Sequence, residues 1–276
     1  MRITDFHCHD FPDALAVRAI AGMCKVTDGV LWAVGDGTLT NHLDHLDLAG
    51  VDRAVMCPIA TKPTQHAAIL AAALAMRDGK RGERAARKIV PFASAHPRDP
   101  DVHRHLEEIA AAGLKGVKLH PYYQGYPLSD PVARQMLKTI ASLGLVVECH
   151  AGYDVGYPGR YDFCGPSEIA DMLRDVKGLK FVAAHLGGCA GFPPHATDPL
   201  LDLGCFIDTS AIHRDWYKDE EMRILAEWPR DRILFGTDFP WVHYPEAIRW
   251  VKSVRDPDDW EALFDGNARR LLGECA

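Results

Sequence analysis

The feature that most constrains the fold of this 276-residue chain is a repeated alternation of short apolar runs with helical patterns. Each run is rich in Val, Ile, Leu or Phe, and several are followed by Gly or Pro. Nearly continuous apolar runs of this kind are typical of strands buried on both faces of a parallel sheet. The expected strands are Ile3–His9, Ala54–Ile59, Ile89–Ala95, Gly116–His120, Leu145–His150, Lys180–His185, Cys205–Ser210 and Ile233–Asp238.

Helical patterns fill most of the intervals between these strands. Pro131, for example, follows the cap candidates Ser129 and Asp130, which marks a helix start. The expected helices are Leu39–Ala49, Gln65–Arg77, Val102–Ala112, Pro131–Leu143, Ser167–Val176, Glu220–Trp228, Pro245–Val254 and Asp258–Leu272. Eight strands alternating with helices favour a single α/β domain over residues 1–276, a (β/α)8 TIM barrel with a C-terminal closing helix, rather than an open sheet.

Two segments depart from this rhythm. Residues 9–38 form a long first βα loop that contains several glycines, and loops of this length after a barrel strand often act as a lid or pocket wall. The charged run Arg77–Lys88 is expected to be a solvated helix end and loop.

Charge and composition limit the classes of partner. The net charge is −7 and there is no long acidic run, which argues against nucleic acid and anionic membranes as default partners. No apolar run approaches the roughly 20 residues that span a bilayer, and no secretory signal is evident. The eight cysteines include no Cys-x-x-Cys pair, and Cys8, Cys57, Cys149 and Cys205 fall in strand-like runs. Reduced thiols in a cytoplasmic protein are therefore expected.

The sharpest chemical feature is His7-Cys8-His9 at the end of the first expected strand. Side chains alternate along a strand, so both imidazoles can enter the barrel while Cys8 packs outward. A lone His-x-His is a weak signal. However, His150, His185 and Asp238 also stand at the ends of expected strands, at the rim where barrel enzymes place their chemistry. Such nitrogen and carboxylate donors suit Zn²⁺, Fe²⁺ or Mn²⁺.

These motifs resemble a known family. His-x-His on the first strand, His150-Ala-Gly, His185-Leu-Gly-Gly and Gly-Thr-Asp238-Phe-Pro resemble the amidohydrolase superfamily, from His7 to Leu272. The likeness is closer to the branch of aminocarboxymuconate-semialdehyde decarboxylase-like proteins. The resemblance implies a TIM barrel with one divalent metal, most commonly Zn with Mn or Fe as alternatives. It implies that His7, His9, His150 and Asp238 hold that metal.

The same resemblance implies catalytic roles for two residues. Asp238 would orient the metal-bound water and accept its proton, and His185 would polarise or protonate the substrate. The physical logic is general, because a divalent ion lowers the pKa of its water to near 7 and a nearby carboxylate can carry the proton away.

Lys118 leaves the number of metals open. Lys118 and His120 are two apart on the fourth expected strand and should share its inward face. In binuclear relatives a carbamylated lysine at this position bridges two metals, whereas in the mononuclear branch the cation faces substrate. One metal is favoured here. In a metal-free reading, Lys118 is a buried cation paired with Glu148 or Asp208.

Substrate contacts are less well specified by the sequence. Lys118, His120 and Arg214 are the candidates for holding a small, anionic substrate. Other residues that follow strand ends are candidates for the mouth or ordinary rim positions: His96, Tyr122, Tyr123, Tyr153, His213, Trp241 and His243.

Three functions stay open at this point. The first is metal-dependent hydrolysis of a C–O or C–N bond in a small organic acid, amide or lactone. The second is non-oxidative decarboxylation of an unsaturated or aromatic acid, with Arg214 and the metal holding the carboxylate. The third is a barrel that binds metal or metabolite without turnover. A homodimer is an open expectation for the assembly state.

Overall fold

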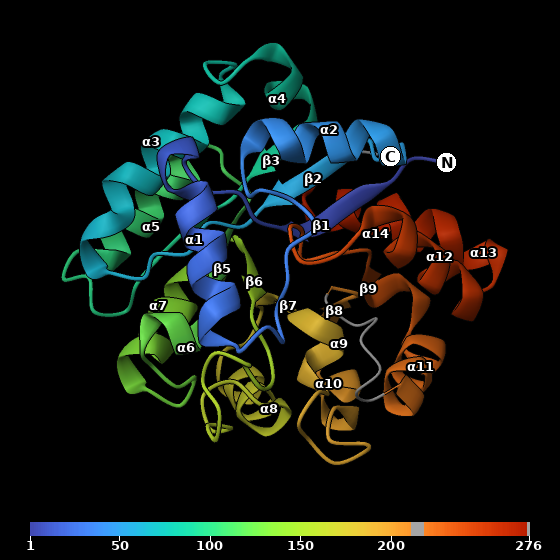
Figure 1. Ribbon diagram of the computed structural model, residues 1–276. Helices are drawn as coiled ribbons and strands as arrows, with labels where there is room; N and C mark the ends of the chain where they lie inside the picture. The colour runs from blue at the N-terminus through green and yellow to red at the C-terminus, as the bar shows by residue number, and fades with distance from the viewer. Residues whose placement is uncertain (211–217, 275–276) are drawn as a thin grey trace.

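The computed structural model describes residues 1–210 and 218–274, and its strands are all paired in parallel (Figure 1). The strands are β1 (Thr4–Cys8), β2 (Arg53–Met56), β3 (Ile89–Pro91), β4 (Ala93–Ser94), β5 (Gly116–Leu119), β6 (Val146–Cys149), β7 (Lys180–Ala183), β8 (Phe206–Asp208) and β9 (Ile233–Leu234). They form one sheet in the order β1-β2-β3 and a second in the order β4-β5-β6-β7-β8-β9.

The third expected strand, Ile89–Ala95, is divided between the two sheets. Its first part, β3, pairs with β2, and Phe92 still donates its N–H to the carbonyl oxygen of Met56 at 3.1 Å. Its second part, β4, pairs instead with β5. The run therefore links the two sheets. Strands in a barrel are staggered, so one strand can meet its two neighbours at different heights.

Backbone hydrogen bonds also join the first strand to the segment around the last. Phe6 donates its N–H to the carbonyl oxygen of Phe235 at 2.7 Å, and Asp238 donates to that of His7 at 2.8 Å. His9 then donates to the carbonyl oxygen of Phe239 at 2.7 Å. These contacts place β1, the first strand, beside the segment around β9, the last strand. The chain therefore forms the α/β barrel that the sequence predicts.

A bulge in β1 modifies the expected alternation of side chains. Asp5 pairs with Ala54 and Cys8 with Met56, so β1 contains one more residue than β2 between these two pairs. Phe6 consequently packs in the inner apolar cluster while Cys8 packs in the outer one, although strict alternation would give them the same face. His7, between them, is turned into the barrel mouth with His9.

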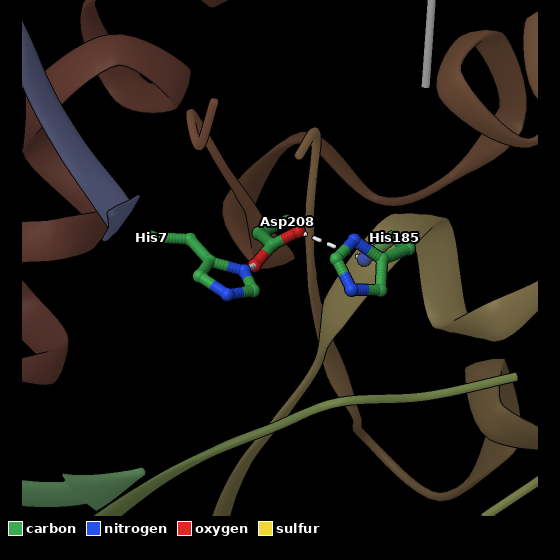
Figure 2. A group of neighbouring side chains, drawn as sticks. All are labelled: His7, His185 and Asp208. Carbon is green, nitrogen blue, oxygen red and sulfur yellow. Dashed lines mark hydrogen bonds and ion pairs between the residues drawn. The ribbon is translucent and has the colours of Figure 1, made fainter. Parts of the chain in front are cut away.

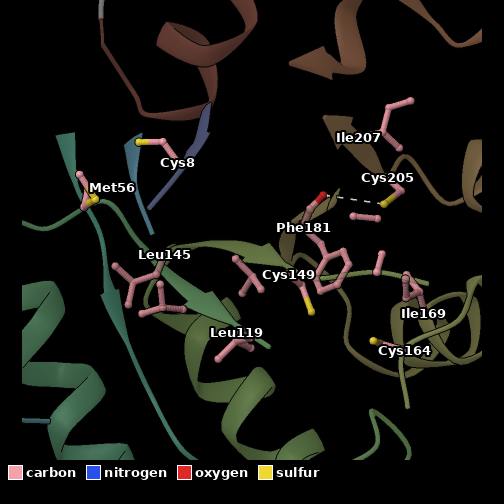
Figure 3. Close-up of a cluster of buried hydrophobic side chains, with 14 of the residues drawn as sticks. Cys8, Met56, Leu119, Leu145, Cys149, Cys164, Ile169, Phe181, Cys205 and Ile207 are labelled. Carbon is pink, nitrogen blue, oxygen red and sulfur yellow. Dashed lines mark hydrogen bonds between the residues drawn. The ribbon is translucent and has the colours of Figure 1, made fainter. Parts of the chain in front are cut away.

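Two apolar clusters hold the barrel. The inner cluster includes Phe6, Val55, Phe92, Val146, Val182 and Leu234, and residues of the last helix close it: Ala268, Leu271 and Leu272. The outer cluster packs strands against helices, and Figure 3 shows Cys149, Phe181 and Ile207 in this layer, with Cys205 directed at the carbonyl oxygen of Phe181.

The helices follow most of the expected ranges to within two residues. They are α1 (Asp13–Val26), α2 (Leu39–Ala49), α3 (His66–Arg77), α4 (Glu83–Lys88), α5 (Val102–Ala111), α6 (Pro121–Gln124), α7 (Pro131–Ser142), α8 (Pro166–Asp175), α9 (Ala184–Gly188), α10 (Asp198–Asp202), α11 (Lys218–Glu227), α12 (Tyr244–Val254), α13 (Pro257–Glu261) and α14 (Asn267–Leu271). Short 3-10 turns lie at Pro63–Gln65 and Arg230–Arg232. The expected helix Asp258–Leu272 is built from α13, a π-helical turn at Ala262–Gly266 and α14.

Two expectations about loops need correction. Residues 9–38 are not a continuous loop, because they contain the helix α1, whose single buried residue is Ala16. The charged run Arg77–Lys88 likewise contains the helix α4. Its Lys88 ammonium lies 2.8 Å from the Asp47 carboxylate, which explains why a charged segment orders there.

The described part of the chain agrees with two further expectations. Its seven cysteines are free thiols, while Cys275 lies outside the described residues. None of the helices formed by residues 1–210 and 218–274 is both long enough and apolar enough to cross a bilayer.

Candidate metal centre and active site

A single cavity of about 1250 Å³ opens at the carboxyl ends of the strands. Its wall brings together the described site residues that the sequence predicts: His7, His9, Lys118, His120, His150, His185 and Asp238. Arg214, the remaining predicted residue, lies outside the described residues, as does His213.

His7, His9 and Asp238 form one group of close donors at the rim. The Asp238 Oδ1 atom lies 3.2 Å from Nε2 of His9 and 3.6 Å from Nε2 of His7. Donor atoms of all three lie within 4.8 Å of one another, which is the separation expected of ligands that share one cation.

The hydrogen bonds of these histidines hold each Nδ1 against a protein acceptor and leave each Nε2 at the cavity, where Nε2 of His7 also accepts from the Lys118 ammonium at 2.7 Å. His9 Nδ1 lies 2.7 Å from the carbonyl oxygen of Cys57, which can only accept, so Nδ1 carries the proton. His7 Nδ1 lies 2.8 Å from Asp208 Oδ2 and donates to that carboxylate. A carboxylate or carbonyl behind the far ring nitrogen is the arrangement that orients metal-ligating histidines.

His150 lies beside this group rather than within it. Its Nδ1 is 3.1 Å from Nε2 of His185, and its own Nε2 is buried without a hydrogen-bond partner, with Asp154 Oδ2 at 3.8 Å. An unpartnered buried nitrogen normally carries a desolvation cost. The orphan Nε2 therefore fits a ligand position, and the donor set as a whole fits a borderline divalent cation.

Asp208 connects two of the histidines (Figure 2). Its Oδ2 accepts from His7, and its Oδ1 accepts from the backbone N–H of His185 at 2.9 Å. Ser210 completes the network, because its N–H and hydroxyl both reach Asp208 Oδ1 and its hydroxyl lies 2.8 Å from His185 Nδ1. Asp208 is fully buried, so its charge acts in a low-dielectric setting.

Lys118 is buried among these groups. Its ammonium lies 2.7 Å from His7 Nε2 and 3.8 Å from Glu148 Oε1. Burial by itself opposes the charged amine, but Glu148 and other nearby negative groups outweigh it and raise the pKa of Lys118. Neither Glu148 carboxylate oxygen has a hydrogen-bond partner, and burial, followed by the nearby Asp208 charge, raises the pKa of Glu148 well above its usual value.

Burial favours the neutral forms of His7, His150 and His185, whereas nearby histidines favour the ionised form of Asp238. Burial, followed by the Lys118 charge, lowers the pKa of His7 to about 3. Burial also lowers the pKa of His150 and His185. For Asp238, burial alone would raise the pKa, but the contacts of its carboxylate with His9 and His7 bring it well below its usual value. Neutral imidazoles and a carboxylate are the protonation states that bind metals.

Left-handed backbone places two of the residues. His185 has φ 57°, Leu186 φ 52° and Asp238 φ 62°. Such conformations are strained for residues with a Cβ, and this strain tends to gather at functional sites. Gly188 is a matching case, since a Cβ on it would lie 2.3 Å from the backbone nitrogen of Gly152. The loops after β6 and β7 thus touch directly, which brings His150 and His185 together.

Aromatic residues form one wall of the mouth. The His120 ring stacks on Tyr123 at 3.9 Å between centroids and on His150 at 4.1 Å. His120 Nε2 lies 3.3 Å from Asp154 Oδ2. Of the other mouth candidates, Tyr123, Tyr153 and Trp241 line the cavity, whereas His96, Tyr122 and His243 are not in its wall.

Three residues of the site carried no recognised role in the sequence. Ser210 and Asp154 bind site histidines, and Asp208 was considered only as a partner for Lys118. Asp208 and Ser210 are two apart at the end of the seventh expected strand, which was a usable signal. Asp154 lies in a loop, where no strand periodicity marks it.

A family model described as Amidohydrolase matches residues 47–273. None of the curated proteins matches the sequence significantly.

Several solved structures share the fold. An uncharacterised TIM-barrel protein from Bordetella bronchiseptica is 19% identical with a TM-score of 0.74, covering 99% of each chain. A probable 2-pyrone-4,6-dicarboxylic acid hydrolase from Acinetobacter baumannii, with citric acid bound, is 18% identical with a TM-score of 0.68, covering 99% of this chain and 100% of that one. A dihydroxybenzoic acid decarboxylase from a Polaromonas species, with bound manganese and the inhibitor 2-nitroresorcinol, is 14% identical with a TM-score of 0.67, covering 99% and 97%.

Proposed function

The chain belongs to the amidohydrolase family of metal-dependent enzymes, and we propose that it hydrolyses a C–O or C–N bond in a small organic acid, amide or lactone. The observation that carries this proposal is the convergence of His7, His9 and Asp238 on one point of the cavity, with their far atoms held by protein acceptors. Both a hydrolase and a decarboxylase occur among proteins of the same fold, so the reaction rests on the site.

In this proposal His7, His9, His150 and Asp238 hold one divalent metal, with Zn the first choice and Mn or Fe the alternatives. When bound, the metal supplies a water of lowered pKa and polarises the substrate carbonyl. His150 is included because its buried Nε2 has no hydrogen-bond partner, although its donor atoms group with those of His120 and Asp154 rather than with the other three. The amine of Lys118 is paired with Glu148, which favours one metal over a carbamate-bridged pair.

The protein's own groups then manage protons and charge. Asp238 is ionised and faces the cavity, so its carboxylate can accept the proton of the attacking water. His185 lines the same cavity and steadies the oxyanion as it forms. In the described arrangement its Nε2 accepts from His150, so it donates only after gaining a proton there. The negative charge of Asp208 favours that protonated form, because it acts to raise the pKa of His185.

Lys118 and His120 are proposed to hold the substrate. Lys118 supplies a buried positive charge at the cavity wall, and His120 supplies a flat stacking surface beside His150. Both features suit an anionic or ring-containing substrate. Arg214 stays a candidate for the same role.

The test compares metal-loaded wild type with His185→Asn and Asp238→Asn across a panel of lactones, amides and esters of organic acids. We expect both variants to bind metal detectably but to lose at least about 100-fold in kcat, as expected when a general acid or base is removed. Equal rates in all three proteins would eliminate the proposed roles.

Decarboxylation is the second candidate, because Lys118 can hold a carboxylate next to the metal ligands. It predicts that CO₂ or bicarbonate appears in proportion to substrate consumed, with no product of water addition. That outcome with an aromatic acid would replace the hydrolase proposal.

A further inference from the structure

The cavity continues well beyond the metal-ligand group. One part contacts His7, His9 and Asp238, and another part is lined by residues of α1 and α3. Its volume of about 1250 Å³ exceeds the range of roughly 300–1,000 Å³ that holds drug-sized ligands. A single-ring acid bound at the ligand group would leave most of this space empty.

Small side chains keep this space open. On α3, Ala68, Ala72 and Ala75 line the cavity at i, i+4 and i+7, which places them on one helical face. On α1, Ala19, Gly22 and Met23 face the same space. We call the space lined by these six residues the α1–α3 groove. Two faces of this kind can pack closely together, but here they stand apart.

The α1 wall of the groove is poorly buried. Only Ala16 of this helix is buried, and Leu15 and Val26, which line the cavity, are 43% and 69% exposed. Figure 1 shows α1 crossing the barrel with β5 behind it. The free energy of removing the apolar surface of two facing walls from water is gained only when an apolar group fills the gap between them.

We propose that the α1–α3 groove binds an apolar arm of the substrate, so that the substrate is an amphiphile. Its polar, hydrolysable centre lies at the metal-ligand group, and an alkyl or aryl arm extends between the two helices. We choose part of the substrate as the occupant because the groove belongs to the same cavity as His9 and Asp238. The inference rests on the proposed function and specifies its substrate class.

The groove predicts a dependence on chain length. Each methylene moved from water into an apolar site contributes about 0.8 kcal/mol, which is about fourfold in affinity. Binding should therefore tighten by about fourfold per methylene while the arm lies in the groove, and level off once the arm reaches its end.

The test measures binding of butanoate, hexanoate and octanoate to the metal-loaded enzyme by titration calorimetry, and turnover of γ-lactones with alkyl arms of matched length. Ala72→Trp fills the groove, and Ala68→Phe fills it one turn earlier. Ala71→Trp is the matched control, because Ala71 is exposed on the same helix but does not line the cavity. We expect the two groove variants to bind butanoate as wild type does and to lose at least tenfold in octanoate affinity, with Ala71→Trp unchanged.

A wild-type affinity that is flat with chain length would overturn the inference, as would groove variants that keep the wild-type slope. A change in sedimentation with Ala72→Trp and no change in slope would assign the groove to a second copy of the chain instead. These results are distinct from failure of the proposed function, in which no lactone is turned over although the chain-length slope in binding persists.

Discussion

Substituting Asp208 with asparagine tests whether a buried carboxylate sets the tautomer of a metal-ligating histidine. Asp208 Oδ1 accepts from three groups, the N–H of His185 and the N–H and hydroxyl of Ser210, while Oδ2 accepts from His7 Nδ1. An asparagine would keep its oxygen on the side with three donors. Its NH₂ group would then face His7 Nδ1.

Two donors cannot share that position, and the other ring nitrogen of His7, Nε2, already faces the Lys118 ammonium at 2.7 Å. His7 would therefore lose the acceptor that fixes its proton on Nδ1 and holds its ring with Nε2 toward the cavity. Removing a carboxylate behind a metal-ligating histidine typically costs 10- to 100-fold in metal affinity, or about 1.4–2.7 kcal/mol. We expect a loss in this range for Asp208→Asn, with a parallel loss of kcat/KM at sub-saturating metal.

Competition of the protein with a chelator for Zn²⁺ measures this affinity directly. Asp265→Asn is the matched control, because Asp265 is also a buried carboxylate, hydrogen-bonded by Thr4 at 2.6 Å and far from the cavity wall. It should lower stability without changing metal affinity. If Asp208→Asn binds Zn²⁺ as tightly as wild type, the tautomer argument is refuted.

Three further predictions concern stability and the metal. Burial lowers the pKa of His42 to about 3. Below the ordinary histidine pKa near 6.5, the unfolded chain therefore binds one proton more than the folded chain, and the free energy of unfolding falls as the pH falls. His42→Gln, which keeps a polar group near Tyr244, should therefore lose about 2 kcal/mol less than wild type between pH 6.5 and 4.5 in urea unfolding. Lys118→Met leaves Glu148 buried without its cation and should destabilise the protein by up to about 3–5 kcal/mol, and by less where Glu148, whose pKa burial raises, takes up a proton. Added bicarbonate should leave wild type at one metal per chain by elemental analysis. Chelation should abolish activity, lower unfolding stability by about 2.7 kcal/mol relative to metal at 100 times its Kd, and be reversed by Zn²⁺ or Mn²⁺.

Much of the fold was accessible to sequence reasoning because it depends on local patterns. Apolar runs and helical spacing predicted the barrel and, to within two residues, most bounds of the eight expected helices, and α2 has the expected bounds of Leu39–Ala49. The helix α1 was missed because the glycines of residues 9–38 favoured a loop, and the short helices α4, α6, α9 and α10 were not expected either. The bulge in β1 escaped because pairing register is set by the partner strand.

The candidate site was predicted through residues at strand ends, which the barrel topology brings to one rim. The donor atoms of His7, His9 and Asp238 lie close together, while the roles of these residues and of His150 as metal ligands stay predictions. The contacts of Asp154 and Ser210 depend on loop conformation, which follows from tertiary packing. A single domain, a homodimer, a cytoplasmic location and an anionic substrate also stay predictions.

The backbone hydrogen bonds between β1 and the segment around β9, which we call the seam, have a consequence for how the enzyme responds to heating or destabilising mutation. His7 and His9 lie on one side of that seam and Asp238 on the other, and Asp238 is tied to His7 by a backbone hydrogen bond. A bound ion would link the first strand of the barrel to the segment that follows the last strand. Thermal fraying or a mutation that loosens this junction would then release the ion long before the helices melt, and metal loss would be an early sign of damage.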